Sequence, residues 1–125
     1  MFCFRPKYRD YVDWTIDPII SFPRCFCPLD NKLFPGDIIN IKGDKLESYY
    51  SNKKDIPGVI ILSGKTYGST RRGVKYYKCV PNDITLPCFL IAHDYKIKGF
   101  IKHKVNKYII FKIKEWVDKH PVGII

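Results

Sequence analysis

The amino-acid sequence predicts an all-β fold in which about five short strands close into a small barrel. The first observation behind this prediction is a series of short apolar or alternating runs, each bounded by turn residues such as Pro-Gly or Pro-Asn-Asp. The second is that most of these runs are separated by segments without helical periodicity. Fairly even spacing of such runs is typical of an all-β barrel.

The predicted strands, in chain order, cover residues 38–42, 59–62, 74–80, 86–92 and 107–114. The last one is the clearest, because Ile109, Phe111 and Ile113 alternate with lysines as in a strand with one buried face. Residues 63–73 contain three glycines and three basic residues, which predicts the exposed loop of a hairpin. Residues 43–55 are polar and are expected to form a loop.

The beginning of the chain carries weaker signals. Pro18, Pro23 and Pro28 interrupt any long helix, and the apolar residues between them follow no clear period. We therefore expect an irregular N-terminal arm over residues 1–32 and a barrel over residues 33–125, in a chain whose length fits one domain.

Composition narrows the class of protein. Apolar residues make up 46% of the chain, which is enough for a core. No apolar run is long enough to span a membrane, and charges in the first residues exclude a signal peptide, so we expect a soluble, cytoplasmic protein. The five cysteines show no disulfide framework, and Cys25 and Cys27 form one pair where a zinc site needs two, so neither a metal nor a cofactor is expected.

The net charge of +10 is concentrated in one part of the chain. Residues 64–114 contain twelve Lys or Arg and two Asp, and 12 − 2 equals the whole net charge. The remaining residues carry ten basic and ten acidic side chains, which cancel. A local positive field interleaved with Tyr and Phe is the pattern of a protein that binds a polyanion such as RNA.

Catalytic motifs are weak by comparison. No Ser or Cys lies in a nucleophile motif, and the carboxylates are scattered along the chain instead of paired for metal-assisted phosphoryl chemistry. The Gly64-Lys65-Thr66 segment resembles the end of a phosphate-binding loop, but the preceding glycine, Gly58, is one residue too far away. A hairpin loop also follows where the motif needs a helix. We therefore expect no enzyme activity.

The basic and aromatic residues form the strongest functional signal. In single-stranded nucleic-acid binding, cations hold the phosphates and aromatic rings stack on the bases. A competing interpretation is that the lysines only solvate the outer face while Tyr and Phe fill the core. The residues predicted to position phosphates are Tyr67, Arg71, Arg72, Lys75, Lys78, Lys98, Lys102 and Lys104, and those predicted to stack on bases are Tyr76 and Phe100.

Several short motifs resemble one known family. Residues 80–91 read VPNDITLPCFLI, which is similar to the F-x-P-x-D-x-R-I-P-x-I-x-I stretch of RNB-family exoribonucleases of the ribonuclease II/R type. Residues 34–39 and 58–61 resemble the G-D-x-V and G-x-V-x strands of the second cold-shock-like OB domain in that family. Trp116, Pro121 and Gly123 resemble its closing motif, with His120 where the family usually has Tyr. These motifs are most similar to those of divergent versions of the domain from large DNA viruses.

The resemblance covers residues 33–123 and implies a five-stranded OB barrel that guides single-stranded RNA to a catalytic domain. In the family, that domain follows immediately and carries the Mg²⁺-binding aspartates for 3′-to-5′ hydrolysis, and we expect it to begin where Ile125 ends. The expected function is therefore that of a non-catalytic RNA-binding accessory domain, in the cytoplasm and, by the viral resemblance, in a virus-infected cell. The alternatives are a basic module that docks an acidic protein or a separate catalytic domain, and a nuclease with an unrecognised site.

Overall fold

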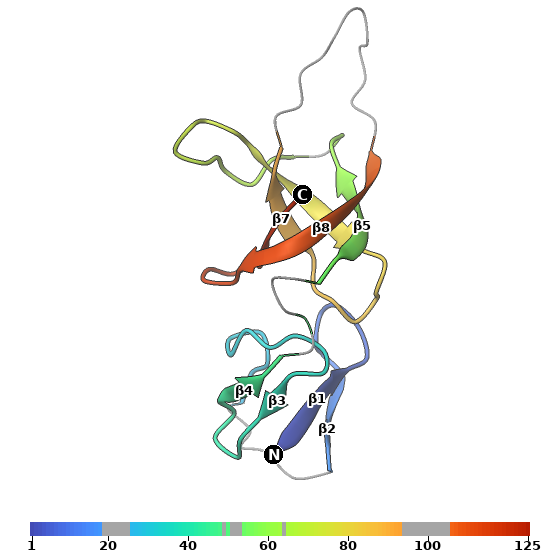
Figure 1. The fold of residues 1–125 in the computed structure, drawn as a ribbon, viewed down its shortest axis with the longest axis vertical. Coiled ribbons are helices and arrows are strands. Elements are labelled where there is room, and N and C mark those ends of the chain that lie inside the picture. The colour runs from blue at the N-terminus through green and yellow to red at the C-terminus, as the bar shows by residue number, and fades with distance from the viewer. Residues whose placement is uncertain (19–25, 49, 51–53, 64, 94–105) are drawn as a thin grey trace, which may run out of the picture.

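The protein consists of two β-structures stacked along its long axis, a barrel and a smaller sheet (Figure 1). The computed structural model describes residues 1–18, 26–48, 50, 54–63, 65–93 and 106–125. In these residues, strands are the only regular secondary structure, and no helix is present that could cross a membrane. The strands are β1 (Phe2–Pro6), β2 (Trp14–Asp17), β3 (Ile38–Ile39), β4 (Lys45–Glu47), β5 (Ile56–Ile61), β6 (Tyr76–Pro81), β7 (Phe89–Ala92), β8 (Lys107–Glu115) and β9 (Val122–Ile124).

The barrel closes in the strand order β5-β6-β7-β9-β8, with β5 also paired to β8. All of its neighbouring pairs are antiparallel except β7 and β9, which run parallel. A closed barrel of five strands in this order is of the OB type. The predicted all-β class and the predicted OB-type barrel are confirmed.

The smaller sheet differs from the sequence prediction. Residues 1–32 were expected to form an irregular arm, but they contain β1 and β2, which pair along four residues each. The strand predicted at 38–42 was expected in the barrel, yet β3 pairs with β1 and β4 in the order β2-β1-β3-β4. The reason is burial: Ile39 packs in a separate core with Phe4, Ile16 and Leu33. The small sheet therefore extends past the predicted boundary at residue 33, and β9 is the fifth barrel strand.

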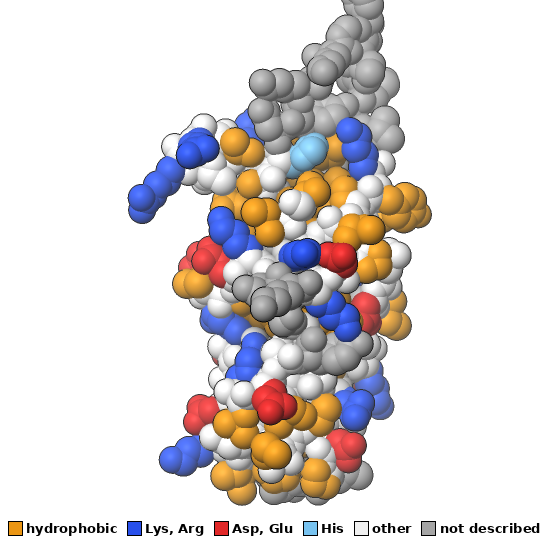
Figure 2. Space-filling model, viewed as in Figure 1, with side chains coloured by type: hydrophobic (Ala, Val, Ile, Leu, Met, Phe, Trp, Pro, Cys, Tyr) orange, Lys and Arg blue, Asp and Glu red, His pale blue; other side chains and the backbone are white. Residues whose placement is uncertain are grey.

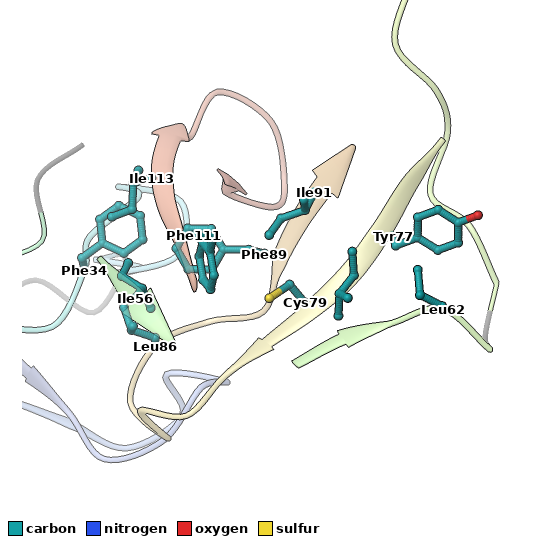
Figure 3. Close-up of a cluster of buried hydrophobic side chains, with 11 residues drawn as sticks. Phe34, Ile56, Leu62, Tyr77, Cys79, Leu86, Phe89, Ile91, Phe111 and Ile113 are labelled. Carbon is teal, nitrogen blue, oxygen red and sulfur yellow. The ribbon is translucent and has the colours of Figure 1, made fainter. Parts of the chain in front are cut away.

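Phe111 lies at the centre of the barrel core beside Phe89, with ring centroids 5.0 Å apart (Figure 3). Two neighbouring strands approach its ring with glycines, Gly58 on β5 and Gly123 on β9. A Cβ atom at Gly123 would lie 2.7 Å from Phe111 Cδ2, and one at Gly58 would lie 2.9 Å from the carbonyl oxygen of Val80. The ring of Phe111 therefore requires a glycine at position 123, whereas at position 58 the nearest obstacle is the backbone of β6.

Two adjacent residues, Leu33 and Phe34, enter different cores and so join the two structures. Leu33 is buried in the small sheet, whereas Phe34 stacks on Phe89 in the barrel with ring centroids 5.8 Å apart. Trp116 packs against both cores, and its ring centroid is 5.0 Å from that of Phe34. Continuous aromatic packing thus holds the sheet against the barrel.

Polar contacts reinforce this junction. Arg9, from the turn after β1, donates hydrogen bonds to the carbonyl oxygens of Asp83 at 3.0 Å and Leu86 at 3.2 Å. Tyr50 donates to the Asp83 carboxylate at 2.5 Å. Burial acts to raise the pKa of Asp83, but the hydrogen bonds from Tyr50 and Thr85, together with nearby Arg9, outweigh it, and the pKa lies below its usual 3.8. The carboxylate is therefore stabilised in its charged form.

We predict that Gly58→Ala and Gly123→Ala each destabilise the protein by about 1–3 kcal/mol, the range for overpacking a tight core. The two should respond differently to Phe111→Leu. That change should partly rescue Gly123→Ala, whose clash is with the ring, but not Gly58→Ala, whose clash is with backbone. Urea unfolding of the single and double variants measures both couplings. Equal rescue of the two glycine variants would contradict this geometry.

A second prediction concerns Asp83. Because its pKa is lower in the folded than in the unfolded chain, it contributes stability above the unfolded pKa, and this contribution is lost as pH falls toward the folded pKa. Asp83→Asn should destabilise the protein by about 1 kcal/mol near neutral pH. The gap from wild type should then narrow as the pH falls through the usual Asp pKa of 3.8 toward the lower folded pKa, as measured by denaturant unfolding. A gap that is constant with pH would contradict the prediction.

Candidate nucleic-acid interface

The loop between β5 and β6 projects from the barrel and carries several predicted site residues (Figure 1). Its two sides hydrogen-bond to each other, from Tyr67 N to Tyr76 O at 2.9 Å and from Tyr76 N to Gly68 O at 2.9 Å. At the tip, Gly73 N donates to Thr70 O at 2.9 Å, and Gly73 has a φ of 82°, which favours glycine. The loop is therefore a defined hairpin extension.

Three cations of this loop lie at and near its tip. Arg71, Arg72 and Lys75 are all exposed, and Lys or Arg side chains project from the loop in Figure 2. Lys65 lies near the base of the loop, with its ammonium 5.2 Å from the centre of the Tyr67 ring. The loop thus presents positive charge well away from the barrel wall.

Strand β6 carries the predicted residues Tyr76 and Lys78 on the outer face of the barrel. Both are half-buried, and they alternate with Tyr77 and Cys79, which are buried in the core. Lys78 is opposite Leu90 on β7. Four predicted residues, Lys98, Phe100, Lys102 and Lys104, lie outside the residues that the structure describes.

The loop between β8 and β9 faces the β5–β6 loop across this surface. The ring of His120 meets the ring of Tyr67 edge-on, with centroids 6.2 Å apart and planes at 74°. Burial is the main cause that lowers the pKa of His120 below its usual 6.5, and the nearby charges of Lys119 and Lys78 lower it further. Two aromatic rings and two ammonium groups therefore come together from β6 and the two loops.

A cavity of about 540 Å³ lies at this convergence. The barrel side of its lining includes Tyr67, Lys78 and Leu90, and the segment after β8 adds Trp116, Asp118, Lys119, His120 and Pro121. The small sheet supplies the other side through the residues Tyr8, Arg9, Asp10, Leu29, Asp30 and Lys32. The cavity is therefore lined by both parts of the molecule.

The charge around the cavity is nearly balanced. Its cations, Arg9, Lys32, Lys78 and Lys119, are offset by the carboxylates of Asp10, Asp30 and Asp118. The apolar part of the lining includes Pro87, Leu90 and Trp116. Such a site suits a ligand with a flat apolar ring and one anionic group better than a stretch of dense negative charge.

Sequence reasoning found only part of this site. Tyr67 and Lys78 were predicted and do line the cavity, whereas Arg71, Arg72, Lys75 and Tyr76 are not in its lining. His120 and Lys119 were not predicted as site residues, nor was any residue of the small sheet. The available signal was the His-Pro-Val-Gly turn, whose position beside β7 only the barrel pairing reveals.

Two features of the described residues concern catalytic chemistry. Within that part, no group of three or more His, Cys, Asp or Glu side chains is arranged to hold a metal ion. Burial, with a smaller effect of Cys88, raises the pKa of the Cys79 thiol to about 12, so this thiol stays protonated at neutral pH.

Comparisons with protein-family models, curated proteins and solved structures find no match to this chain.

We predict that His120 titrates below its usual pKa of 6.5 in the free protein and that Lys119→Gln raises this pKa toward 6.5, because a neighbouring positive charge is removed. NMR chemical shifts of the imidazole, followed against pH, measure both values. The matched control is Lys114→Gln, which removes the same charge from exposed β8 and should leave His120 unchanged. A pKa at or above 6.5 in the wild type would contradict the prediction.

Proposed function

We propose that this chain binds single-stranded RNA across the outer face of β6 and β7, as a non-catalytic accessory domain in the cytoplasm. The observation that carries the proposal is the convergence of Tyr67, Lys78 and His120 over those strands. In OB-type barrels, oligonucleotides bind the second and third strands and the loops after the first and fourth strands. Here those positions are β6, β7, the β5–β6 loop and the β8–β9 loop.

The distribution of charge supports the proposal. Arg71 and Arg72 are exposed on the projecting loop, Lys75 follows them, and Lys78 continues the positive surface onto β6. Phosphates would contact these cations, while Tyr67, Tyr76 and His120 offer rings for stacking. Lys98, Phe100, Lys102 and Lys104 lie outside the described residues and remain a sequence-based prediction.

We further propose that the barrel is related to the second cold-shock-like OB domain of RNB-family exoribonucleases, in divergent, virus-type form. The strand order supports this relationship, and so do the positions of the residues that carry the resemblance. Gly58 and Gly123 both face Phe111, and the Pro121 carbonyl accepts a hydrogen bond from Leu90 N at 2.9 Å. Incubation of labelled RNA with Mg²⁺ tests the non-catalytic part, because cleavage that a chelator abolishes would contradict it.

A second candidate function is docking of an acidic protein, such as a separate catalytic domain. The outer face of β8 favours it, since Tyr108 is 84% exposed and Ile110 is 61% exposed beside Lys112 and Lys114. Hydrophobic side chains interspersed with Lys and Arg cover much of the barrel face shown in Figure 2. An apolar centre with a basic rim fits an acidic, partly apolar partner surface.

We predict that binding of oligo(U) or oligo(A) weakens steeply with salt and that Arg71→Ala/Arg72→Ala lowers the slope of log K against log salt by roughly 1.4, about 0.7 for each lost phosphate contact. Fluorescence anisotropy at several salt concentrations measures the slope. The control Lys42→Ala/Lys114→Ala removes the same charge from exposed residues outside the β5–β6 loop and should change it much less. Salt-insensitive binding, or none at low salt, would contradict the proposal and favour the docking function.

A further inference from the structure

The cavity between the barrel and the small sheet has walls that are held in place independently of any ligand. Arg9 both lines the cavity and donates two hydrogen bonds to carbonyl oxygens before β7. Trp116 lines it while packing against both hydrophobic cores. A pocket with fixed walls loses little entropy when a ligand enters, which is the condition for selective binding of a small group.

The lining combines the two properties of a nucleotide-binding site, which are an apolar or aromatic surface and nearby positive charge. Leu29, Pro87 and Leu90 offer apolar surface, and the rings of Tyr67 and His120 stand at one side. Lys78 and Lys119 place positive charge beside those rings, close enough to lower the pKa of His120. A nucleotide has the matching parts, a flat base and an anionic phosphate.

The indole of Trp116 contains a buried hydrogen-bond donor. Its indole Nε1–H is buried and has no hydrogen-bond partner among the described residues, although almost all buried polar atoms in proteins have one. Because Trp116 also lines the cavity, a base that enters the cavity changes the environment of this indole N–H.

We propose that this cavity binds a single nucleobase of the RNA strand, turned out from its neighbours, with its phosphate against Lys78 and Lys119. The proposal rests on the RNA-binding function above and adds a specific subsite to it. The small sheet has a direct role in this arrangement, because Tyr8 and Leu29 form the wall opposite the barrel. The projecting loop then supplies charge that acts on any sequence, whereas the cavity contacts one base.

A peptide fits the site less well. Extended peptides commonly bind by adding a strand to a free sheet edge, and the barrel beside the cavity is closed, with β7 paired to both β6 and β9. The nearly balanced charge of the lining also favours a ligand with one anionic group over a strongly acidic segment.

The test uses the two tryptophans of the chain as reporters. The full protein is titrated with uridine and adenosine monophosphates, and the two indole N–H signals are followed by NMR after assignment with Trp14→Phe. Trp116 should shift on saturation, whereas Trp14, which packs against Phe4 and Phe26 in the small sheet and is not in the cavity lining, should not. Inorganic phosphate alone should shift Trp116 far less.

Matched variants then connect the cavity to RNA. Tyr8→Ala should weaken oligo(U) or oligo(A) binding roughly tenfold, as for loss of one stacked base, and should leave the salt slope unchanged because Tyr8 carries no charge. Tyr108→Ala removes the same side chain from the exposed face of β8 and should change neither quantity. Leu29→Trp, which fills the cavity from the same wall, should reproduce the effect of Tyr8→Ala.

The outcomes separate the two proposals. RNA binding without a Trp116 shift, and without an effect of Tyr8→Ala or Leu29→Trp, would overturn the base subsite and leave the RNA-binding function standing. A Trp116 shift with monophosphates in a protein that does not bind RNA would overturn the RNA function and keep a nucleotide site. Absence of both would overturn both, and a shift with an acidic peptide alone would replace the base with a protein ligand.

Discussion

The contact between Phe34 and Trp116 is the constraint on which the rest of the structure depends. Phe34 follows directly after Leu33, so a single peptide unit places one side chain in the small sheet and the next in the barrel. Trp116 directly follows β8 and packs against both the small sheet and the barrel. Because interiors are packed at near-crystalline density, such a shared aromatic contact allows little sliding of one part on the other. The walls of the cavity beside Trp116 are fixed for the same reason.

The exposed positive charge and the cavity lie in different parts of this molecule. The projecting loop holds exposed cations on a hydrogen-bonded hairpin, while the cavity holds rings, apolar side chains and nearly balanced charge. Contacts to phosphate position a nucleic acid without reading its sequence, whereas contacts to bases discriminate between sequences. Under the proposed RNA-binding function, the loop supplies affinity and the cavity supplies discrimination, and the two properties can change independently.

Sequence patterns predicted the barrel well where strands are long and half-buried. The alternation around Phe111 on β8 is an example, because each inward residue meets the core. The patterns did not predict β9, whose three residues include Gly123, and they placed the strand at β3 in the barrel, although its two residues pair across the small sheet. Such short strands are defined by their partners and not by their own periodicity.

The same distinction holds for the site. Tyr67 and Lys78 were found because a basic, aromatic stretch of chain contains both. His120 and Tyr8 were missed because they join that stretch only through tertiary packing, from the β8–β9 loop and the turn after β1. Charged residues that are close together in the sequence indicate a surface that attracts ligands through its electrostatic field. A cavity, in contrast, is formed by segments that are far apart in the sequence.

The residues that carry the family resemblance are mainly those that the barrel needs in order to close. Gly58 and Gly123 make room for Phe111, and the Pro121 carbonyl accepts a hydrogen bond from β7. The proposed relationship to the RNB-family domain rests on such barrel positions, whereas function depends on the groups displayed on a barrel. In this chain the displayed groups include Tyr8 and Leu29 of the small sheet, which lie outside the stretch that carries the resemblance. The feature that distinguishes this protein from a bare OB barrel is therefore the wall that the small sheet adds beside β6 and β7.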